Sequence, residues 1–165
     1  MALGEYGGSI ANPQRTLIVN YNIEKVKQAI RLSYHYVSDI KLEQCSFDDV
    51  LNIYTLHLSE VLSLGSNMIL LLTKEDENKT KIVFEMQRAY GSYNSSVEID
   101  YANKQLNMVC DALSTVLSMT EDDIEKLRTG KMIVPSTKVK SAKSGWGCTI
   151  LLTIIIIGLL IWILS

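Results

Sequence analysis

The chain has 165 residues, of which 47% are hydrophobic, and its 18 acidic and 16 basic side chains give a formal net charge of −2. The charge is unevenly distributed: residues 1–128 hold every acid and carry a net charge of −6, while residues 129–165 carry +4. An acidic body argues against a nucleic-acid-binding protein, which needs a basic face on its folded part. Three cysteines without CxxC spacing and only two histidines make a zinc site unexpected, and unpaired thiols fit a cytoplasmic location.

The N-terminal part of the sequence predicts a flexible lead-in, a strand and a helix. Residues 1–14 are rich in glycine, and Arg15–Asn20 is a short run containing β-branched residues, as is typical of a strand. Asn22 is expected to cap the helix that follows. The apolar positions of this helix recur at spacings of three and four: Ile23, Val26, Ile30 and Tyr34.

Between residues 38 and 101 the hydrophobic period changes to two, which predicts an antiparallel meander of about five strands. We expect a hairpin turn at Leu64–Asn67, because Gly and Asn accept positive φ, and a turn at residues 46–49. Met68–Thr73 is apolar on both faces, which is typical of a central strand. The other expected strands cover residues 38–45, 52–62, 81–88 and 97–101.

A helical period returns at Asn103–Met119, whose apolar stripe comprises Leu106, Val109, Cys110, Leu113, Val116 and Leu117. Cys110 is interpreted as a small buried apolar residue and not as a nucleophile. The opposite side is expected to face solvent and includes Lys104, Gln105 and Asp111. Thr120 is expected to open a second short helix that begins with three acidic residues and ends at Gly130.

These elements predict an α+β domain over residues 15–130, an antiparallel meander packed by an N-terminal helix and a long C-terminal helix. In element order it resembles the helix-grip superfamily of START-like and polyketide-cyclase-like proteins. Three segments carry the resemblance: the entry RTLIVNYNIEKVKQAI, the hairpin around Leu64–Asn67, and VEIDYANKQLNMVCDALSTVL, where a strand is expected to lead into the closing helix. The resemblance implies an apolar ligand held between the sheet and the closing helix.

The C-terminal segment Trp146–Ser165 predicts a transmembrane helix. No charged residue occurs from Cys148 to Leu164, and a helix over Trp146–Leu164 would be roughly 28 Å long, close to the thickness of a bilayer core. Trp146 and Trp162 could then place one indole at each membrane interface. A buried core helix is the alternative, but a helix that is apolar on every face and follows a lysine-rich segment favours a tail anchor.

Lysines that precede this span predict its orientation. The linker, residues 131–145, contains Lys131, Lys138, Lys140 and Lys143 and no acid. Because an excess of lysine marks the cytoplasmic flank of a span, the N-terminal domain is expected to be cytoplasmic in a single-pass membrane protein. The same lysines would be attracted to anionic membrane lipids.

Small residues inside the span leave two alternatives open. Thr149 and Thr153 lie on one helix face and could pack against another helix, but Gly158 lies well around the helix and there is no GxxxG motif, so the span could equally be a simple anchor. Cys148 lies one turn inside the cytoplasmic interface, where a thiol can be acylated. Its alternative interpretation is a tolerated small residue.

The sequence predicts no catalytic residue, metal or cofactor, because it contains no GxGxxG, GxxxxGK, GxSxG or HExxH motif. His57 is interpreted as a surface or satisfied strand residue and Asp48–Asp49 as part of a turn. Two functions remain. The favoured one is an interaction or assembly subunit at the membrane, with a protein partner or a homo-oligomer. The alternative is a membrane-tethered START-like module that binds a lipid or another apolar ligand.

Overall fold

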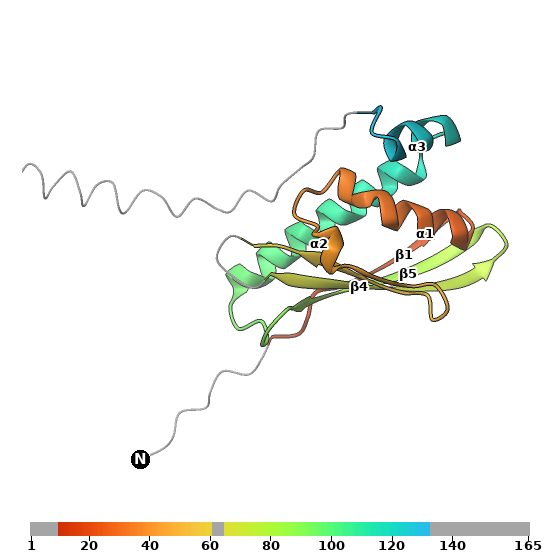
Figure 1. The fold of residues 1–165 in the computed structure, drawn as a ribbon. Helices are drawn as coiled ribbons and strands as arrows, with labels where there is room; N and C mark the ends of the chain where they lie inside the picture. The colour runs from red at the N-terminus through yellow and green to blue at the C-terminus, as the bar shows by residue number, and fades with distance from the viewer. Residues whose placement is uncertain (1–9, 61–64, 133–165) are drawn as a thin grey trace, which may run out of the picture.

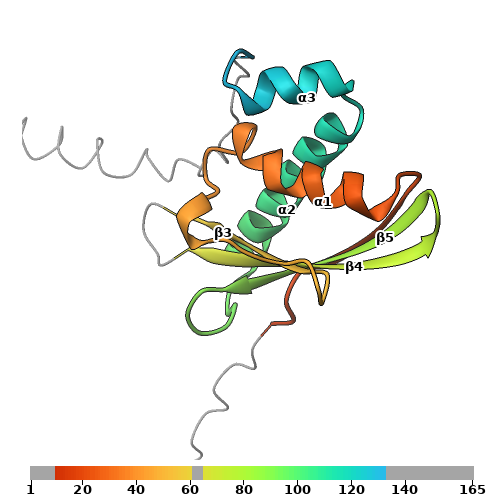
Figure 2. The same ribbon diagram turned by 45° about the vertical axis from the view of Figure 1, so that its right-hand side comes forward.

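The computed structural model describes residues 10–60 and 65–132, which form one antiparallel sheet and a layer of helices. All three α-helices lie on the same face of the sheet, and among the described residues no helix covers the other face (Figures 1 and 2). We call these the covered face and the open face. The architecture is therefore α+β, as predicted.

The sheet has five strands in the order β1-β5-β4-β3-β2, and every pairing is antiparallel. The strands β2 to β5 form a meander, and β1 pairs with β5 at the other edge of the sheet from β2. Met68–Thr73, the segment predicted to be central, lies in the middle strand. The strands are β1 (Gln14–Val19), β2 (Ser46–Asp48), β3 (Ile53–Leu58), β4 (Ser66–Asp76) and β5 (Lys79–Arg88).

The first helix, α1 (Ile23–Leu32), begins where the sequence predicts it, because the side chain of Asn22 accepts a hydrogen bond from the backbone N–H of Lys25 at 2.8 Å. Its apolar side chains Val26 and Ile30 are buried against the core. A short 3₁₀ turn, η1 (Ser33–His35), continues from its C-terminal end.

The segment between α1 and β3 differs from the prediction. No strand covers residues 38–45: Ile40 makes a single bridge to Leu58, and a 3₁₀ turn, η2 (Leu42–Gln44), follows. Residues 46–48, expected in a turn, form β2, and the turn lies at the next four residues. The alternation of Ile40, Leu42 and Gln44 resembled a strand, but three residues in a 3₁₀ turn can mimic period two over so short a distance.

The hairpin predicted at Leu64–Asn67 falls partly in residues 61–64, outside the described residues. Gly65 has φ +83°, and a Cβ built there would lie 2.4 Å from the carbonyl oxygen of Leu58. Only glycine therefore fits this position. The strand β4 begins immediately afterwards at Ser66, so the strand includes two residues that were assigned to the turn.

The long helix α2 (Ser96–Leu117) starts earlier than expected, and the strand predicted at residues 97–101 is wrong. Ser95 caps the helix by accepting from the N–H of Glu98 at 3.3 Å, while the Glu98 carboxylate accepts from the N–H of Asn94 at 3.0 Å. This reciprocal arrangement fixes the first turn and overrides the strand propensity of the Val97–Tyr101 segment. The predicted apolar stripe is buried throughout.

The final helix, α3 (Glu121–Arg128), agrees with its prediction. Thr120 is the N-cap and accepts from the N–H of Asp123 at 3.2 Å, and Gly130 follows the C-terminal end with φ +69°. Ile124 and Leu127 are its buried anchors. They join one cluster with the side chains of the covered face, whose largest fully buried members include Tyr54, Phe84, Met68, Met86, Leu106 and Leu113.

Candidate functional site: the open face of the sheet and the buried amide of Gln105

The open face carries aliphatic side chains where solvent-facing strand positions are ordinarily polar. On the central strand β4, Leu70 and Leu72 are buried on the covered face, whereas Leu71 between them is 43% exposed. On the edge strand β1, Ile18 is 57% exposed, and on β3, Ile53 is 37% exposed. These side chains cannot contribute to the core because strand alternation points them away from it.

Strand register brings these side chains together. Ile53 pairs with Leu71, and Leu71 pairs in turn with Val83 on β5. Directly opposite residues on one sheet face have their Cβ atoms about 5 Å apart, so the three form a row across the sheet. Ile69 and Ile18 flank this row on β4 and β1. We call this set the open-face patch: Ile18, Ile53, Ile69, Leu71 and Val83.

Two opposite charges flank the patch on β5. Lys81 precedes Val83 by two residues and Glu85 follows it by two, so all three lie on the open face. The Glu85 carboxylate accepts hydrogen bonds from Gln87 and Asn12, both at 2.9 Å, and from Gln14 at 3.2 Å. These amides lower the pKa of Glu85, chiefly through Gln87, and they orient the carboxylate without neutralising it.

The turn between β2 and β3 is tied to α1 and presents two more aliphatic side chains. Asp48 Oδ1 accepts from the N–H groups of Val50 and Leu51 at 2.9 and 2.8 Å, which stabilises the turn at residues 49–52. Val50 is 89% exposed and Leu51 62% exposed. Asn52 completes the turn with φ +56°.

Asp49 connects this turn to α1 and to β3. Its carboxylate accepts hydrogen bonds from Tyr54 Oη and, at 2.5 Å, from Arg31 Nη2 on α1. These bonds, the one from Tyr54 first, lower the pKa of Asp49, while burial and the same bond raise the pKa of Tyr54. The Arg31 guanidinium also lies over the Phe47 ring at 4.8 Å. The turn is therefore tied to α1 and to Tyr54, which is buried on the covered face.

Gln105 is a polar side chain among the buried apolar side chains of α2. It was predicted to face solvent, but it is fully buried, and neither Nε2 nor Oε1 has a hydrogen-bond partner within the described structure. The helix begins at Ser96 and runs straight through this position, so Gln105 shares the buried side with Leu106 and Val109. A buried amide without partners costs about 1–3 kcal/mol, which makes this position suited to a polar group supplied from outside the chain.

Other polar side chains singled out in the sequence are satisfied in the fold. His57 Nδ1 lies 2.9 Å from Asn67 Oδ1 on the neighbouring strand. Cys110 is 7% exposed, as predicted for a small core residue, and burial raises the pKa of its thiol. In the described ranges, no group of three or more His, Cys, Asp or Glu side chains is placed to hold a metal ion.

The predicted membrane and linker residues lie mostly outside the described residues. Lys131 is described: it is exposed beyond the end of α3, and its N–H donates to the carbonyl of Lys126 at 2.9 Å. None of the helices in residues 10–60 and 65–132 is long and apolar enough to cross a bilayer. The positions outside the described ranges are Lys138, Lys140, Lys143, Trp146, Cys148, Thr149, Thr153, Gly158 and Trp162.

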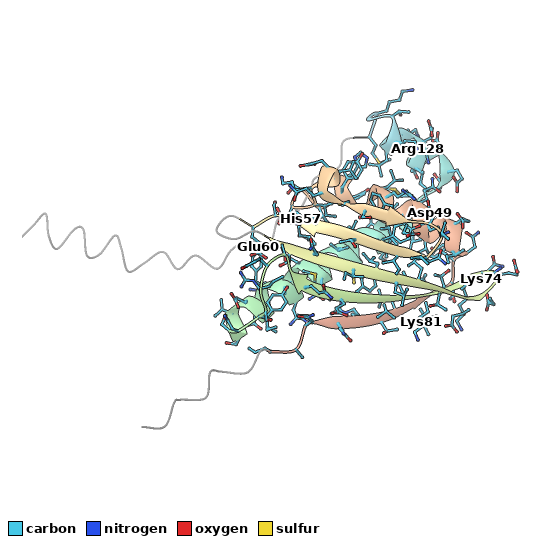
Figure 3. The ribbon with its side chains drawn as sticks, turned by 60° about the horizontal axis from the view of Figure 1, so that its bottom comes forward. Asp49, His57, Glu60, Lys74, Lys81 and Arg128 are labelled. Carbon is cyan, nitrogen blue, oxygen red and sulfur yellow. The ribbon has the colours of Figure 1, made fainter. Side chains whose placement is uncertain are left out.

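Sequence reasoning missed the open-face patch, although a signal was present. MILLLT was predicted to be a central strand that is apolar on both faces, and no consequence was drawn from its second face, which the described helices leave uncovered (Figure 1). On β3 and β5, fully buried positions alternate with less buried ones, and the described helices cover only the face of the fully buried positions (Figure 1). Figure 3 brings the open face forward and shows Lys74 and Lys81 toward one end of the strands and His57 and Glu60 toward the other.

No protein-family model and no curated protein matches the sequence. Solved structures do match. An uncharacterised protein from Bacillus thuringiensis shares 13% identity with a TM-score of 0.46, over 65% of this chain and 96% of its own. A START superfamily protein from Mycobacterium smegmatis shares 11% identity with a TM-score of 0.35, over 70% and 98%. The Zhui aromatase/cyclase from a Streptomyces species shares 12% identity with a TM-score of 0.30, over 74% and 98%.

The matching structures thus include the START-like and cyclase classes to which the order of elements pointed. With TM-scores of 0.46 or less, these likenesses carry no argument about this chain. They identify neither a ligand nor an activity for it.

Proposed function

We propose that this chain is a single-pass membrane protein, anchored by residues 146–165, whose cytoplasmic α+β domain is an interaction or assembly subunit and not an enzyme. The open-face patch is the observation that carries the proposal. Single exposed aliphatic residues are ordinary on protein surfaces, but a contiguous set in register across neighbouring strands is typical of a contact surface.

The position of the chain at the end of α3 supports the same proposal. The helix α3, after which the described chain ends at residue 132, lies on the helical side of the domain, opposite the open face (Figure 1). An anchor attached on that side would hold the domain at the membrane while leaving the open-face patch accessible. The acidic body and the lysine-rich linker favour the cytoplasmic orientation.

The test is the mass of the full chain after extraction from membranes in a mild detergent, measured by light scattering with the detergent contribution subtracted. We expect an assembly heavier than one 18.5 kDa chain, and we expect Leu71→Asp to reduce it to a single chain. Val97→Asp is the matched control, because Val97 is 73% exposed but lies on α2, away from the open face. A wild-type chain that already has the mass of one copy would refute the proposal.

The anchor is tested separately by ending the chain at Ser144. We expect the shortened protein to leave the membrane fraction and to remain folded, because its hydrophobic span is removed and its core is intact. Retention of the shortened protein on membranes after a high-salt wash would show that residues 146–165 are not the principal anchor.

A second function, binding of an apolar ligand with a polar group, is favoured by Gln105 alone. Its two unpartnered amide atoms could pair with a hydroxyl or carbonyl of a ligand held against the covered face. Native mass spectrometry of the purified full chain would show such a ligand as an added mass that disappears in Gln105→Leu. Wild-type protein without any added mass would argue against this function.

A further inference from the structure

We infer that the occupant of the open face is a second copy of this chain, packed sheet on sheet about a two-fold axis. The inference rests on the proposed function, since it names the partner of the same surface. It starts from the order of side chains along β5, where a positive charge at Lys81, an aliphatic Val83 and a negative charge at Glu85 succeed one another on the open face.

This order is complementary to itself. Consider a two-fold axis that lies between two facing sheets, perpendicular to the strands and above the row Ile53–Leu71–Val83. The rotation reverses the strand direction, so each residue of the row meets its own copy. Lys81 then lies opposite the partner's Glu85, and Glu85 lies opposite the partner's Lys81. Sheets that pack face to face are about 10 Å apart, a gap that Lys and Glu side chains can bridge.

Both charges are available for such a contact. Lys81 has no acidic partner within the described structure, whereas Lys74 at the same hairpin pairs with Glu77 at 2.9 Å. Within residues 10–60 and 65–132, Glu85 is bonded only to the neutral amides of Asn12, Gln14 and Gln87. Its carboxylate is therefore held in place and remains charged, which suits it to a cation from outside the domain.

The size of the surface indicates a weak dimer that depends on the membrane. Four strands about 4.8 Å apart, each contributing six residues at about 3.3 Å per residue, give a face of roughly 380 Å² per copy, compared with about 800 Å² in a standard interface. Two anchors in one membrane require the two-fold axis to stand perpendicular to it, and residues 133–145 can span at most about 45 Å, enough to reach past the domain. Confinement to the membrane raises the effective concentration of the second copy.

Charge exchange between two variants tests the register. In a Lys81→Glu dimer both charge contacts become Glu–Glu, and in a Glu85→Lys dimer both become Lys–Lys. A mixed dimer of one copy of each has one Glu–Lys contact and one Lys–Glu contact, so both contacts are complementary. We would express full-length copies with two different tags, separately and together, and measure co-purification from detergent extracts.

We expect each variant alone to lose homodimer at least about tenfold relative to wild type, and the mixed pair to recover it. Lys104→Glu, at an exposed position of α2, is the matched control and should dimerise like wild type. Circular dichroism of every variant checks that loss of dimer is not loss of fold.

A mixed pair that recovers no dimer would overturn the two-fold register. The proposed function would still stand if Leu71→Asp reduced the mass of a wild-type assembly that contains another protein. If wild-type chains with different tags never co-purify and the wild-type mass is that of one copy, the dimer and the proposed function are both wrong.

Discussion

The two faces of the sheet are built from the same strands, yet their aliphatic side chains have different surroundings. On the covered face, Met68, Leu70 and Phe84 are completely buried against the helices. On the open face, Leu71 and Ile53 keep 43% and 37% of their surface exposed. Burial on folding is the main source of stability, so the covered face accounts for the fold. The open face contributes less buried surface to folding, and the proposed contact with a second copy would account for its apolar character.

Polar groups show the reverse contrast. The carboxylate of Glu85 on the open face accepts three hydrogen bonds, whereas the amide of Gln105 in the covered layer accepts and donates none within the described structure. Water could satisfy Glu85 without any of these bonds, so their effect is to orient it. Gln105 has no access to bulk water. Hydrogen bonds thus orient the carboxylate on the open face, whereas the amide of Gln105 in the covered layer is unsatisfied within the described residues, as is Nε2 of His35 in η1.

The largest expected effect belongs to the covered layer. Leu113→Ala removes a side chain that is 1% exposed beneath α2, and we expect the free energy of unfolding of a chain ending at Ser144 to fall by about 2–5 kcal/mol. Chemical denaturation measures this loss. Ser114→Ala, at an exposed position next to it, is the control. A variant as stable as its parent would mean that α2 does not pack on the sheet at this position.

Gln105→Leu should change stability in the opposite direction. It replaces an unsatisfied buried amide with an apolar group of similar size, and we expect the free energy of unfolding to rise by about 1–3 kcal/mol in protein that carries no ligand. The same denaturation experiment measures the gain, with Lys104→Leu on the exposed side of the helix as control. A clear loss of stability would show that the amide is satisfied by bound water or by a ligand.

Glu98→Gln addresses the start of α2 and its dependence on pH. The pKa of Glu98 is held below its ordinary value of 4.5, chiefly by the N–H of Asn94 and also by Arg88, against the opposing effect of burial. A lowered folded pKa contributes stability that is fully present above the unfolded pKa and is lost as the pH falls through the folded pKa. We expect the variant to be about 1 kcal/mol less stable at pH 7.

The pH series supplies the check on this prediction. The difference between Glu98→Gln and its parent should shrink as the pH falls below the ordinary pKa of 4.5 and through the lowered pKa of the folded carboxyl, because the parent then loses the charge that stabilises it. A difference that stays constant down to pH 3 would show that the charge of Glu98 does not stabilise the helix start.

The same helix start shows how far the sequence could predict the fold. Periodicity identified α1 and the buried stripe of α2, because each spans enough residues for its period to be clear. The helix α3 was identified from its end residues Thr120 and Gly130, and the central strand from its unbroken apolar run. Residues 97–101 were assigned to a strand, although Ser95 and Glu98 have the spacing of a capping box. This helix start could therefore have been predicted from the sequence. The 3₁₀ turn at residues 42–44 could not, since three residues are too few to define a period.

The candidate site was harder to predict than the fold. The described helices leave one face of Met68–Thr73 uncovered, and which face this is depends on where they pack. The strand sequence is apolar on both sides and does not contain that information. The buried position of Gln105 has a similar cause. Its spacing from Leu106 and Val109 fits the apolar stripe, but a polar side chain is expected on the solvent side unless a partner for it is known.

The smallest expected effect on stability belongs to the open face. Leu71→Thr removes an aliphatic side chain that is 43% exposed, and threonine suits a strand, so we expect the free energy of unfolding to change by no more than about 0.5 kcal/mol. Leu72→Thr is the matched control. Leu72 is the next residue on the same strand and is 3% exposed on the covered face, so burying a hydroxyl there should cost about 2 kcal/mol or more. Denaturation of the two variants side by side measures the contrast. If Leu71→Thr is as destabilising as Leu72→Thr, the side chain of Leu71 contributes to the stability of the domain itself. A partner is then not needed to explain why this position is aliphatic.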